Sequence, residues 1–554
     1  MTSVLSATPS DGSDLVFLPL GGAGEIGMNL NCYGYGTAEE RAWIIVDCGV
    51  MFGRETSTPG VDLMLPDVRF LEENREDIAG LVLTHGHEDH IGAVAHLWPR
   101  LRCPVYATPF TARLLEDKLE EADLKDMVKL KVVPLGGRIK LGPFDIELIS
   151  ITHSIPEPNA IAIRTPLGVV VHTGDWKIDP DPQLGETTDD RALRKLGEQG
   201  VIACVCDSTN ALVSGESGSE ARVKRALHDL IGSLKGRVAV TSFASNVARL
   251  DSIAHAARAH GREVVLVGRA MRHMVTCARD TGYLKDFPAL RDEEEAPRLP
   301  RDRVLFLCTG SQGEPRAALA RIAAGEHPFV SLGEGDSVIF SSRIIPGNEL
   351  AIFELQNKLA ARGVAVLTER DHFVHVSGHP ARDELAAMYS WVKPRIAVPV
   401  HGELRHMSEH ARFARELQVP EAIVAQNGQM VRLAPGRAEI IDEAPAGRLY
   451  LDGRLLTHED EGYARARRSL SFAGFIGVTL ILDRNGRLAA DPVLHMEGIP
   501  EAVFAPVRDA VDRALNGKRR LDEDLTEQVR IAARRAANDV WGKKPVVRVQ
   551  TAEV

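Results

Sequence analysis

The feature that most constrains this chain is a cluster of metal-binding side chains at residues 85–90. His85, His87, Asp89 and His90 follow an apolar run and precede an apolar segment that is compatible with a helix. Residues two apart on a strand point to the same side, so we expect His85 and His87 to reach a common point where the strand ends. Asp89 and His90 are then expected in the turn into the helix, facing the same space from the other side.

Neutral imidazole and carboxylate groups are ligands for divalent ions such as zinc or manganese, and four of them this close indicate two ions rather than one. A lone histidine is more often a surface or core residue, but three with an aspartate at a strand-to-helix junction rarely arise by accident. The segment is not the zincin motif, because His87 and His90 are three residues apart and His85 lies on the strand side.

The composition fits a chain of several globular domains. Its 554 residues predict two to four domains, and 44% hydrophobic with 26% charged residues is ordinary globular usage. The net charge of -11 gives no indication of a nucleic-acid binder. It does not exclude an RNA substrate either, since bound cations and a local basic groove can make the electrostatic potential positive at the binding site.

Seven cysteines are scattered, without the paired spacing of a disulfide framework or a zinc ribbon, which predicts a reducing compartment. The first residues, 1–14, carry neither a basic nor an apolar leader region, and no apolar run approaches the ~20 residues of a membrane span. We therefore expect a cytoplasmic protein without membrane segments.

A GxGxxG match at Gly22, Gly24 and Gly27 is not interpreted as a dinucleotide site, because the segment after it, 29–35, predicts a strand and not a helix. We expect a tight hairpin there. Asp47, after the next strand, is either a turn former or a carboxylate that orients metal-bound histidines.

Further polar residues follow predicted strands along the chain. His153 alone is equally compatible with a ligand and with an ordinary polar residue at a strand end, and Asp175, Asp207 and His401 each follow another apolar run. Residues 220–367 alternate helix and strand as in a parallel, helix-covered sheet. The tail predicts a small α/β domain with a hairpin at Asn485 and Gly486, and its basic clusters at 465–468 and 518–520 are interpreted first as solvated surface.

Together these residues resemble the β-CASP branch of the metallo-β-lactamase nucleases. HxHxDH at 85–90, the insertion after Asp207 and the second histidine cluster at 375–379 carry the resemblance, and the opening glycine-rich segment and the C-terminal domain make the chain similar to the ribonuclease J family. The resemblance implies an α/β chain, with a four-layer αββα metallo-β-lactamase fold, an inserted α/β β-CASP domain and a small α/β C-terminal domain. The expected boundaries are 1–218 and 364–450 for the lactamase parts, 219–363 for β-CASP, 451–464 for a linker and 465–554 for the C-terminal domain.

The resemblance also implies the roles of individual residues. His85, His87 and His153 would hold one ion, Asp89, His90 and His401 the other, and Asp175 would bridge them. The substrate-contacting residues would be His375, Val376, Ser377, Gly378 and His379. Asp207 and His379 match the proton-transfer positions, and which of the two donates the proton is left open. Asp47 would support the metal-bound histidines.

The expected function is hydrolysis of single-stranded RNA in RNA processing and mRNA decay, with two zinc or manganese ions and both 5′-to-3′ exonuclease and endonuclease activity. Partners implied by the resemblance are RNA, a second or further copies of the chain through the C-terminal domain, and an RNA-decay complex. A hydrolase of another ester or lactam class would share the first metal motif but has no use for the long insertion. An RNA-binding scaffold with a non-catalytic metal site is the third hypothesis, and an open two-ion site is hard to explain as a structural staple.

Overall fold

The computed structural model describes residues 12–53, 57–517 and 523–554, and within these ranges the chain forms two compact units. The first comprises residues up to Met51 and Leu65–Gly447, and the second comprises Phe52–Met64 and Arg448–Val554. The basic cluster at 518–520 and most of the N-terminal segment 1–14 lie outside the described residues.

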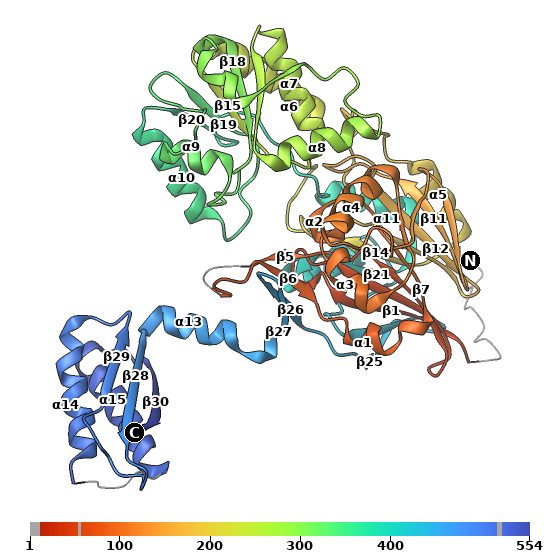
Figure 1. Ribbon diagram of the computed structural model, residues 1–554. Coiled ribbons are helices and arrows are strands. Elements are labelled where there is room, and N and C mark those ends of the chain that lie inside the picture. Colours follow the sequence, from red (N-terminus) through yellow and green to blue (C-terminus); the bar gives the residue numbers. More distant parts are fainter. Residues whose placement is uncertain (1–11, 54–56, 518–522) are drawn as a thin grey trace. The chain divides into compact units, whose positions relative to one another are not determined.

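Two sheets packed face to face form the centre of the first unit (Figure 1). The first sheet runs β25 (Glu439–Glu443), β24 (Gln429–Ala434), β1 (Asp14–Gly21), β3 (Leu30–Gly36), β4 (Arg41–Val46), β7 (Ile78–Val82), β8 (Val105–Ala107) and β9 (Leu130–Val132). The second runs β10 (Arg138–Leu141), β11 (Phe144–Ser150), β12 (Asn159–Thr165), β13 (Gly168–His172), β14 (Val201–Asp207), β21 (Pro394–Val400) and β23 (Glu421–Ala422).

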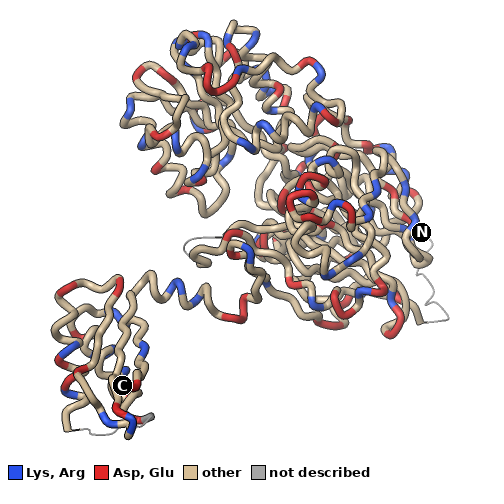
Figure 2. Tube along the Cα trace, in the orientation of Figure 1, with Lys and Arg blue, Asp and Glu red and all other residues tan. Residues whose placement is uncertain are grey.

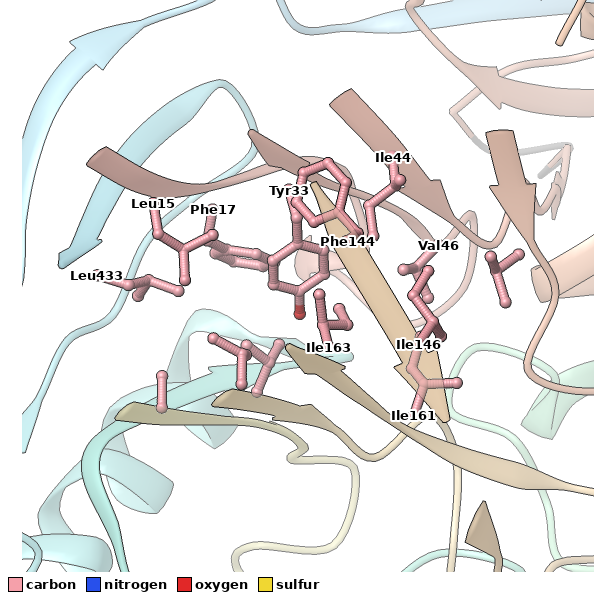
Figure 3. Close-up of a cluster of buried hydrophobic side chains, with 14 of the residues drawn as sticks. Leu15, Phe17, Tyr33, Ile44, Val46, Phe144, Ile146, Ile161, Ile163 and Leu433 are labelled. Atoms are coloured by element: carbon pink, nitrogen blue, oxygen red, sulfur yellow. The ribbon is translucent and has the colours of Figure 1, made fainter. Parts of the chain in front are cut away.

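The core between these sheets consists of inward-facing apolar side chains from alternate strand positions. Phe17, Tyr33 and Ile44 come from the first sheet and Phe144 and Ile163 from the second, and all five are fully buried (Figure 3). Burying such side chains contributes roughly 1.5–3 kcal/mol each. This core holds the strand ends that carry the polar residues in a fixed arrangement.

Helices cover the outer faces of the two sheets, so the expected four-layer αββα fold is confirmed. They are α1 (Arg69–Glu73), α2 (Glu88–Ile91), α3 (Val94–Leu101) and α4 (Pro109–Glu121) on the side of the first sheet, and α5 (Asp190–Gln199), α11 (Arg382–Val392) and α12 (Leu404–Glu416) on the second. The glycine-rich segment is followed by β3, which pairs antiparallel with β1, so the predicted hairpin is confirmed.

The inserted region contains a parallel sheet of its own, as expected. Its strands run β17 (Leu290–Arg291), β16 (Glu263–Val267), β18 (Val304–Cys308), β15 (Val238–Thr241), β19 (Ser337–Phe340) and β20 (Ala365–Leu367). Its helices are α6 (Glu220–Ser233), α7 (Val247–Ala259), α8 (Arg269–Asp280), α9 (Ala318–Ala324) and α10 (Glu349–Ala361). Helix α8 was not expected, although it buries Met271, Val275 and Ala278 at helical spacing.

The second unit contains a small α/β domain. Strands β29 (Val493–Glu497), β28 (Phe475–Leu482) and β30 (Val546–Glu553) form its sheet, and α14 (Phe504–Leu515) and α15 (Glu523–Trp541) pack on it. The segment expected as a linker, 451–464, contains β27 (Leu455–His458), which pairs with β26 (Arg448–Asp452), and it leads into α13 (Tyr463–Ala473). The sheet that contains β26 and β27 also includes β6 (Leu63–Pro66) and β5 (Met51–Phe52).

Two local expectations around the histidine motif are wrong. Strand β7 ends at Val82, so His85 and His87 lie in the loop after it and not on the strand. Asp89 and His90 belong to the short helix α2, and α3 begins only at Val94. The side chains converge because the loop is folded back by tertiary hydrogen bonds, and strand alternation is not the cause.

Candidate metal centre

Two groups of donor atoms meet where the strands of both sheets end. The first contains His85, His87, His153 and Asp175, whose donor atoms all lie within 4.8 Å of one another. His87 Nδ1 lies 3.0 Å from His85 Nε2 and 3.1 Å from His153 Nε2. Asp175 Oδ2 lies 4.0 Å from His85 Nε2 and 3.9 Å from His153 Nε2. Separations of this kind are those between the ligands of one ion.

The second group contains Asp89, His90 and His401, together with the same Asp175. Asp175 Oδ2 lies 3.2 Å from His90 Nε2, and Oδ1 lies 2.5 Å from His401 Nδ1. Asp89 Oδ2 lies 3.7 Å from His90 Nε2 and 3.5 Å from His401 Nε2. Asp175 therefore belongs to both groups, as a bridging carboxylate must.

Burial keeps the first three imidazoles in the form that binds metal. It lowers the pKa of His87 to about 3 and holds the pKa of His85 and His153 well below the usual value. Burial by itself raises the pKa of Asp175, but the nearby His401 and His90 outweigh it and hold that pKa well below its usual range. The first group thus presents neutral nitrogen donors and an ionised carboxylate. In the second group burial lowers the pKa of His90 and His401, but Asp175 outweighs it and raises both.

One ring nitrogen of His401, Nε2, is buried and is left without a hydrogen-bond partner within the described part of the chain. A buried polar atom without a partner costs about 1–3 kcal/mol, and a bound ion or water is one way in which such an atom is satisfied. A divalent cation fits this atom, since the facing Asp89 oxygen is also a metal donor.

Asp47 lies beneath the second group and is fully buried. Its Oδ2 accepts a hydrogen bond from His90 Nδ1 at 2.7 Å, and its two oxygens accept from Thr84 N at 2.7 Å and Thr84 Oγ1 at 2.8 Å. Thr84 Oγ1 in turn lies 3.0 Å from His85 Nδ1. Asp47 therefore holds the ring of His90 and the turn that carries His85.

Asp207 and His379 meet beside the two groups. His379 Nδ1 lies 2.8 Å from Asp207 Oδ2 and 3.8 Å from Asp175 Oδ2. Burial lowers the pKa of His379, but Asp207 outweighs it and raises that pKa to about 9. Asp207 therefore favours the protonated form of this imidazole.

The segment expected to contact substrate lies directly against the first donor group. The Gly378 carbonyl accepts from His153 Nδ1 at 2.6 Å, which leaves His153 Nε2 facing the first group. His379 and Ser377 are partly exposed, whereas the Val376 side chain is buried and His375 lies away from both donor groups. The backbone at Gly378 can approach closely because a Cβ there would lie 2.8 Å from the His153 ring.

Several supporting residues were not singled out from the sequence. Asn210 Nδ2 donates to Ser377 Oγ at 2.8 Å and to the His379 carbonyl at 3.0 Å, and so fixes this segment. Asn29 Nδ2 donates to the Asp89 carbonyl at 3.1 Å. Asn210 follows Asp207 closely enough to be suspected, but nothing in the local sequence around Asn29 points to the site.

The fold and the site define a metal-dependent hydrolase of the metallo-β-lactamase superfamily with a β-CASP insertion. Family models match four consecutive parts of the chain: "Metallo-beta-lactamase superfamily" at 29–187, "Ribonuclease J, beta-CASP domain" at 235–359, "Zn-dependent metallo-hydrolase RNA specificity domain" at 363–423 and "Ribonuclease J C-terminal domain" at 463–554.

Curated relatives match nearly the full length. The Ribonuclease J of Sinorhizobium meliloti is 49% identical and covers 97% of both chains, and that of Mycolicibacterium smegmatis is 40% identical over 93% of this chain and 91% of its own. A solved Enterococcus faecalis protein of unknown function shares the fold, with a TM-score of 0.51 at 16% identity, covering 76% of this chain and 100% of its own.

The chain belongs to the ribonuclease J family and is a metal-dependent ribonuclease. Its fold implies binding of divalent metal, and its substrate is RNA. Among the described residues, no helix is long and apolar enough to cross a membrane.

Proposed function

We propose that the two donor groups hold two divalent ions, zinc or manganese, with Asp175 between them. His85, His87 and His153 form one site, and Asp89, His90 and His401 form the other. The neutral imidazoles of the first group, the shared carboxylate and the unpartnered Nε2 of His401 support this assignment. Zinc and manganese accept the same ligands, and availability decides between them.

Two such ions, held by these residues, would supply a hydroxide nucleophile and would neutralise charge on the phosphoryl oxygens. The remaining requirement is a proton for the departing sugar oxygen, and His379 meets it. Its Nδ1 is held by Asp207, so Nε2 is the atom free to transfer the proton. Asp207 thus keeps the imidazole charged and oriented, and His379 is the proton donor of the pair.

The segment 375–379 binds the RNA strand beside the metals. Ser377 and His379 present partly exposed polar groups there, and Val376 contributes through its backbone because its side chain is buried. His375 presents a buried Nδ1 that has no hydrogen-bond partner among the described residues. Figure 2 shows Lys and Arg residues interspersed with Asp and Glu along the chain, so RNA is attracted chiefly by the metal centre and by local basic groups.

The activity proposed is 5′-to-3′ exonucleolytic and endonucleolytic cleavage of single-stranded RNA in RNA processing and mRNA decay, in the cytoplasm. The C-terminal domain, from residue 465, joins copies of the chain into dimers or tetramers, and an RNA-decay complex is the expected wider partner. The lactamase parts end at 218 and 450, with the β-CASP domain at 219–363. Family membership across the whole length supports these points.

The observation that carries the proposal is the sharing of Asp175 between two donor groups with His379 alongside. The test is cleavage of a 5′-monophosphorylated, 3′-labelled single-stranded RNA by the wild type, by His87→Ala and by the surface variant His228→Ala, with manganese or zinc. Loss of cleavage only in His87→Ala is expected. A circular RNA of the same sequence isolates the endonuclease activity, because it has no 5′ end.

Cleavage by His87→Ala at the wild-type rate would overturn the ligand assignment. Binding of RNA by the wild type with no cleavage under either metal would favour the scaffold hypothesis. Intact circular RNA alongside degraded linear RNA would remove the endonuclease part of the proposal.

A further inference from the structure

The geometry points to a third cation site, separate from the catalytic groups, formed by Asp117, His273 and Cys277. The donor atoms of these residues lie within 4.8 Å of one another. Asp117 Oδ2 lies 3.3 Å from His273 Nδ1 and 3.8 Å from Cys277 Sγ, and Sγ lies 3.9 Å from His273 Nδ1. Zinc bond lengths of about 2.0–2.3 Å in tetrahedral geometry require ligand separations of roughly 3.3–3.6 Å, so small side-chain adjustments would complete the site.

Two helices bring these residues together. His273 and Cys277 are four residues apart on α8, and therefore lie on the same face of the helix. Asp117 projects from α4, which contacts α8. The three ligands thus come from the two regions that are far apart in the sequence, the lactamase part and the β-CASP insertion.

Arg113 orients the carboxylate of Asp117 for this role. Its Nη1 lies 2.5 Å from Asp117 Oδ1 and its Nε lies 3.0 Å from Asp280 Oδ2. One oxygen of Asp117 is therefore held by the guanidinium, and the other, Oδ2, faces His273 and Cys277. Oδ2 of Asp117 therefore keeps a lone pair for a cation, while the contact of Oδ1 with Arg113 holds the carboxylate in place.

The chemistry of the ligands favours a soft divalent ion such as zinc. A thiolate with an imidazole and a carboxylate is a zinc ligand set, and the catalytic groups contain no sulfur. His273 is partly exposed, so water can take the fourth position. Burial raises the pKa of Cys277 to about 11, with Arg113 opposing it, so binding releases a proton and strengthens as pH rises.

A nucleophilic Cys-His-Asp arrangement is the competing interpretation, and burial argues against it. Cys277 is fully buried in the described structure, so no substrate carbonyl or phosphate can reach its sulfur. A small cation entering past the partly exposed His273 needs no such access. Its effect is to fasten α8 to α4 beside the junction where Tyr283 Oη donates to Glu157 at 3.0 Å.

Cobalt(II) is the probe, because thiolate ligation produces a charge-transfer absorption that a nitrogen and oxygen site lacks. The full chain is freed of metal with a chelator and titrated with cobalt. The expected result is this absorption in the wild type, in the surface control His228→Asn and in His87→Ala, which lacks a proposed catalytic ligand. It is lost in Cys277→Ser and at least several-fold weaker in His273→Asn.

Thermal unfolding of each protein checks that the variants are folded, and zinc should raise the unfolding midpoint of the wild type more than that of His273→Asn. His273 is partly exposed, so its replacement should leave the protein folded. The His273→Asn variant therefore tests the site if Cys277→Ser fails to fold. Absence of the absorption in the wild type, its persistence in Cys277→Ser, or its full strength in His273→Asn would each overturn the site.

Discussion

His379 and Asp207 are 172 positions apart in the chain, and their Nδ1 and Oδ2 atoms lie 2.8 Å apart beside the metal centre. Asp207 is fully buried at the end of β14, and the backbone N–H of Thr209 donates to its Oδ1 at 2.8 Å. The carboxylate of Asp207 is therefore held in place independently of His379. In the proposed mechanism the contact between Asp207 and His379 raises the pKa of His379 and so favours the charged form that a proton donor needs.

Replacing His379 should reduce turnover without removing metal. General acid catalysis contributes about 10²–10⁴-fold, so His379→Gln should lower kcat by roughly that factor with little change in metal content. The measurements are single-turnover cleavage of RNA and metal analysis of the same preparation. Asp207→Asn should cause a smaller loss, because the histidine remains but loses its charge partner, and an unchanged rate in both variants would contradict the assignment.

Asp47→Ala should weaken metal binding although Asp47 belongs to neither donor group. The variant removes the acceptor for His90 Nδ1 and for both Thr84 donors. Loss of such a supporting carboxylate typically costs 10–100-fold in metal affinity or activity. Competition with a chelator of known affinity gives the change, and Asp145→Ala on β11 serves as the control. Equal affinity in both variants would show that the histidine rings need no such support.

Gly49→Ala should disturb the helix that carries Asp89. A Cβ at Gly49 would lie 1.7 Å from the Asp89 carbonyl oxygen and 2.6 Å from His90 N, so α2 must move. Overpacking of this kind costs about 1–3 kcal/mol, and we expect a lower unfolding midpoint together with reduced RNA cleavage. Gly333→Ala is the matched control, because only one atom, at 3.9 Å, lies near its added Cβ. Indistinguishable midpoints would be evidence against the close contact.

The buried pair of Arg249 and Glu220 should make stability depend on pH. Arg249 Nη2 donates to Glu220 Oε1 at 2.6 Å, and its Nη1 donates to the carbonyls of Ser341 and Val374, so it joins the insertion to the segment before His375. Burial raises the pKa of Glu220, but Arg249 outweighs it and lowers that pKa. The stabilisation is therefore complete above the unfolded-state pKa of about 4.3 and disappears as pH falls through the lower folded-state value.

Glu220→Gln should accordingly cost about 3–5 kcal/mol at pH 7, since it leaves a buried guanidinium without its charge partner. The difference in unfolding midpoint between wild type and variant should shrink below about pH 4. Thermal unfolding followed by circular dichroism from pH 3 to pH 8 gives both values, with the exposed Glu354→Gln as the control. A difference that stays constant across this range would contradict the prediction.

The sequence was sufficient for much of the architecture, because strands and helices leave local patterns. The strand before Asp47 and the hairpin after the glycine-rich segment were predicted correctly, and the parallel sheet of the insertion followed from its alternation of helix and strand. β12 and α8 were missed although local signals are present: Pro158 precedes β12, and α8 carries the buried apolar residues Met271, Val275 and Ala278 at helical spacing. The segment Phe52–Met64 clusters with the second unit, a long-range pairing that no local pattern announces.

The sequence by itself determined which side chains could donate to a metal ion, since histidines and aspartates stand at the ends of the apolar runs that form strands. Only the tertiary structure decided which atoms meet: that Asp175 faces both groups, that Asp47 holds His90, and that Asp117 joins a histidine and a cysteine of α8. The physical reason is that burial patterns are local along the chain, whereas these contacts depend on strand order, on loops folded back by distant hydrogen bonds and on the packing of one region against another.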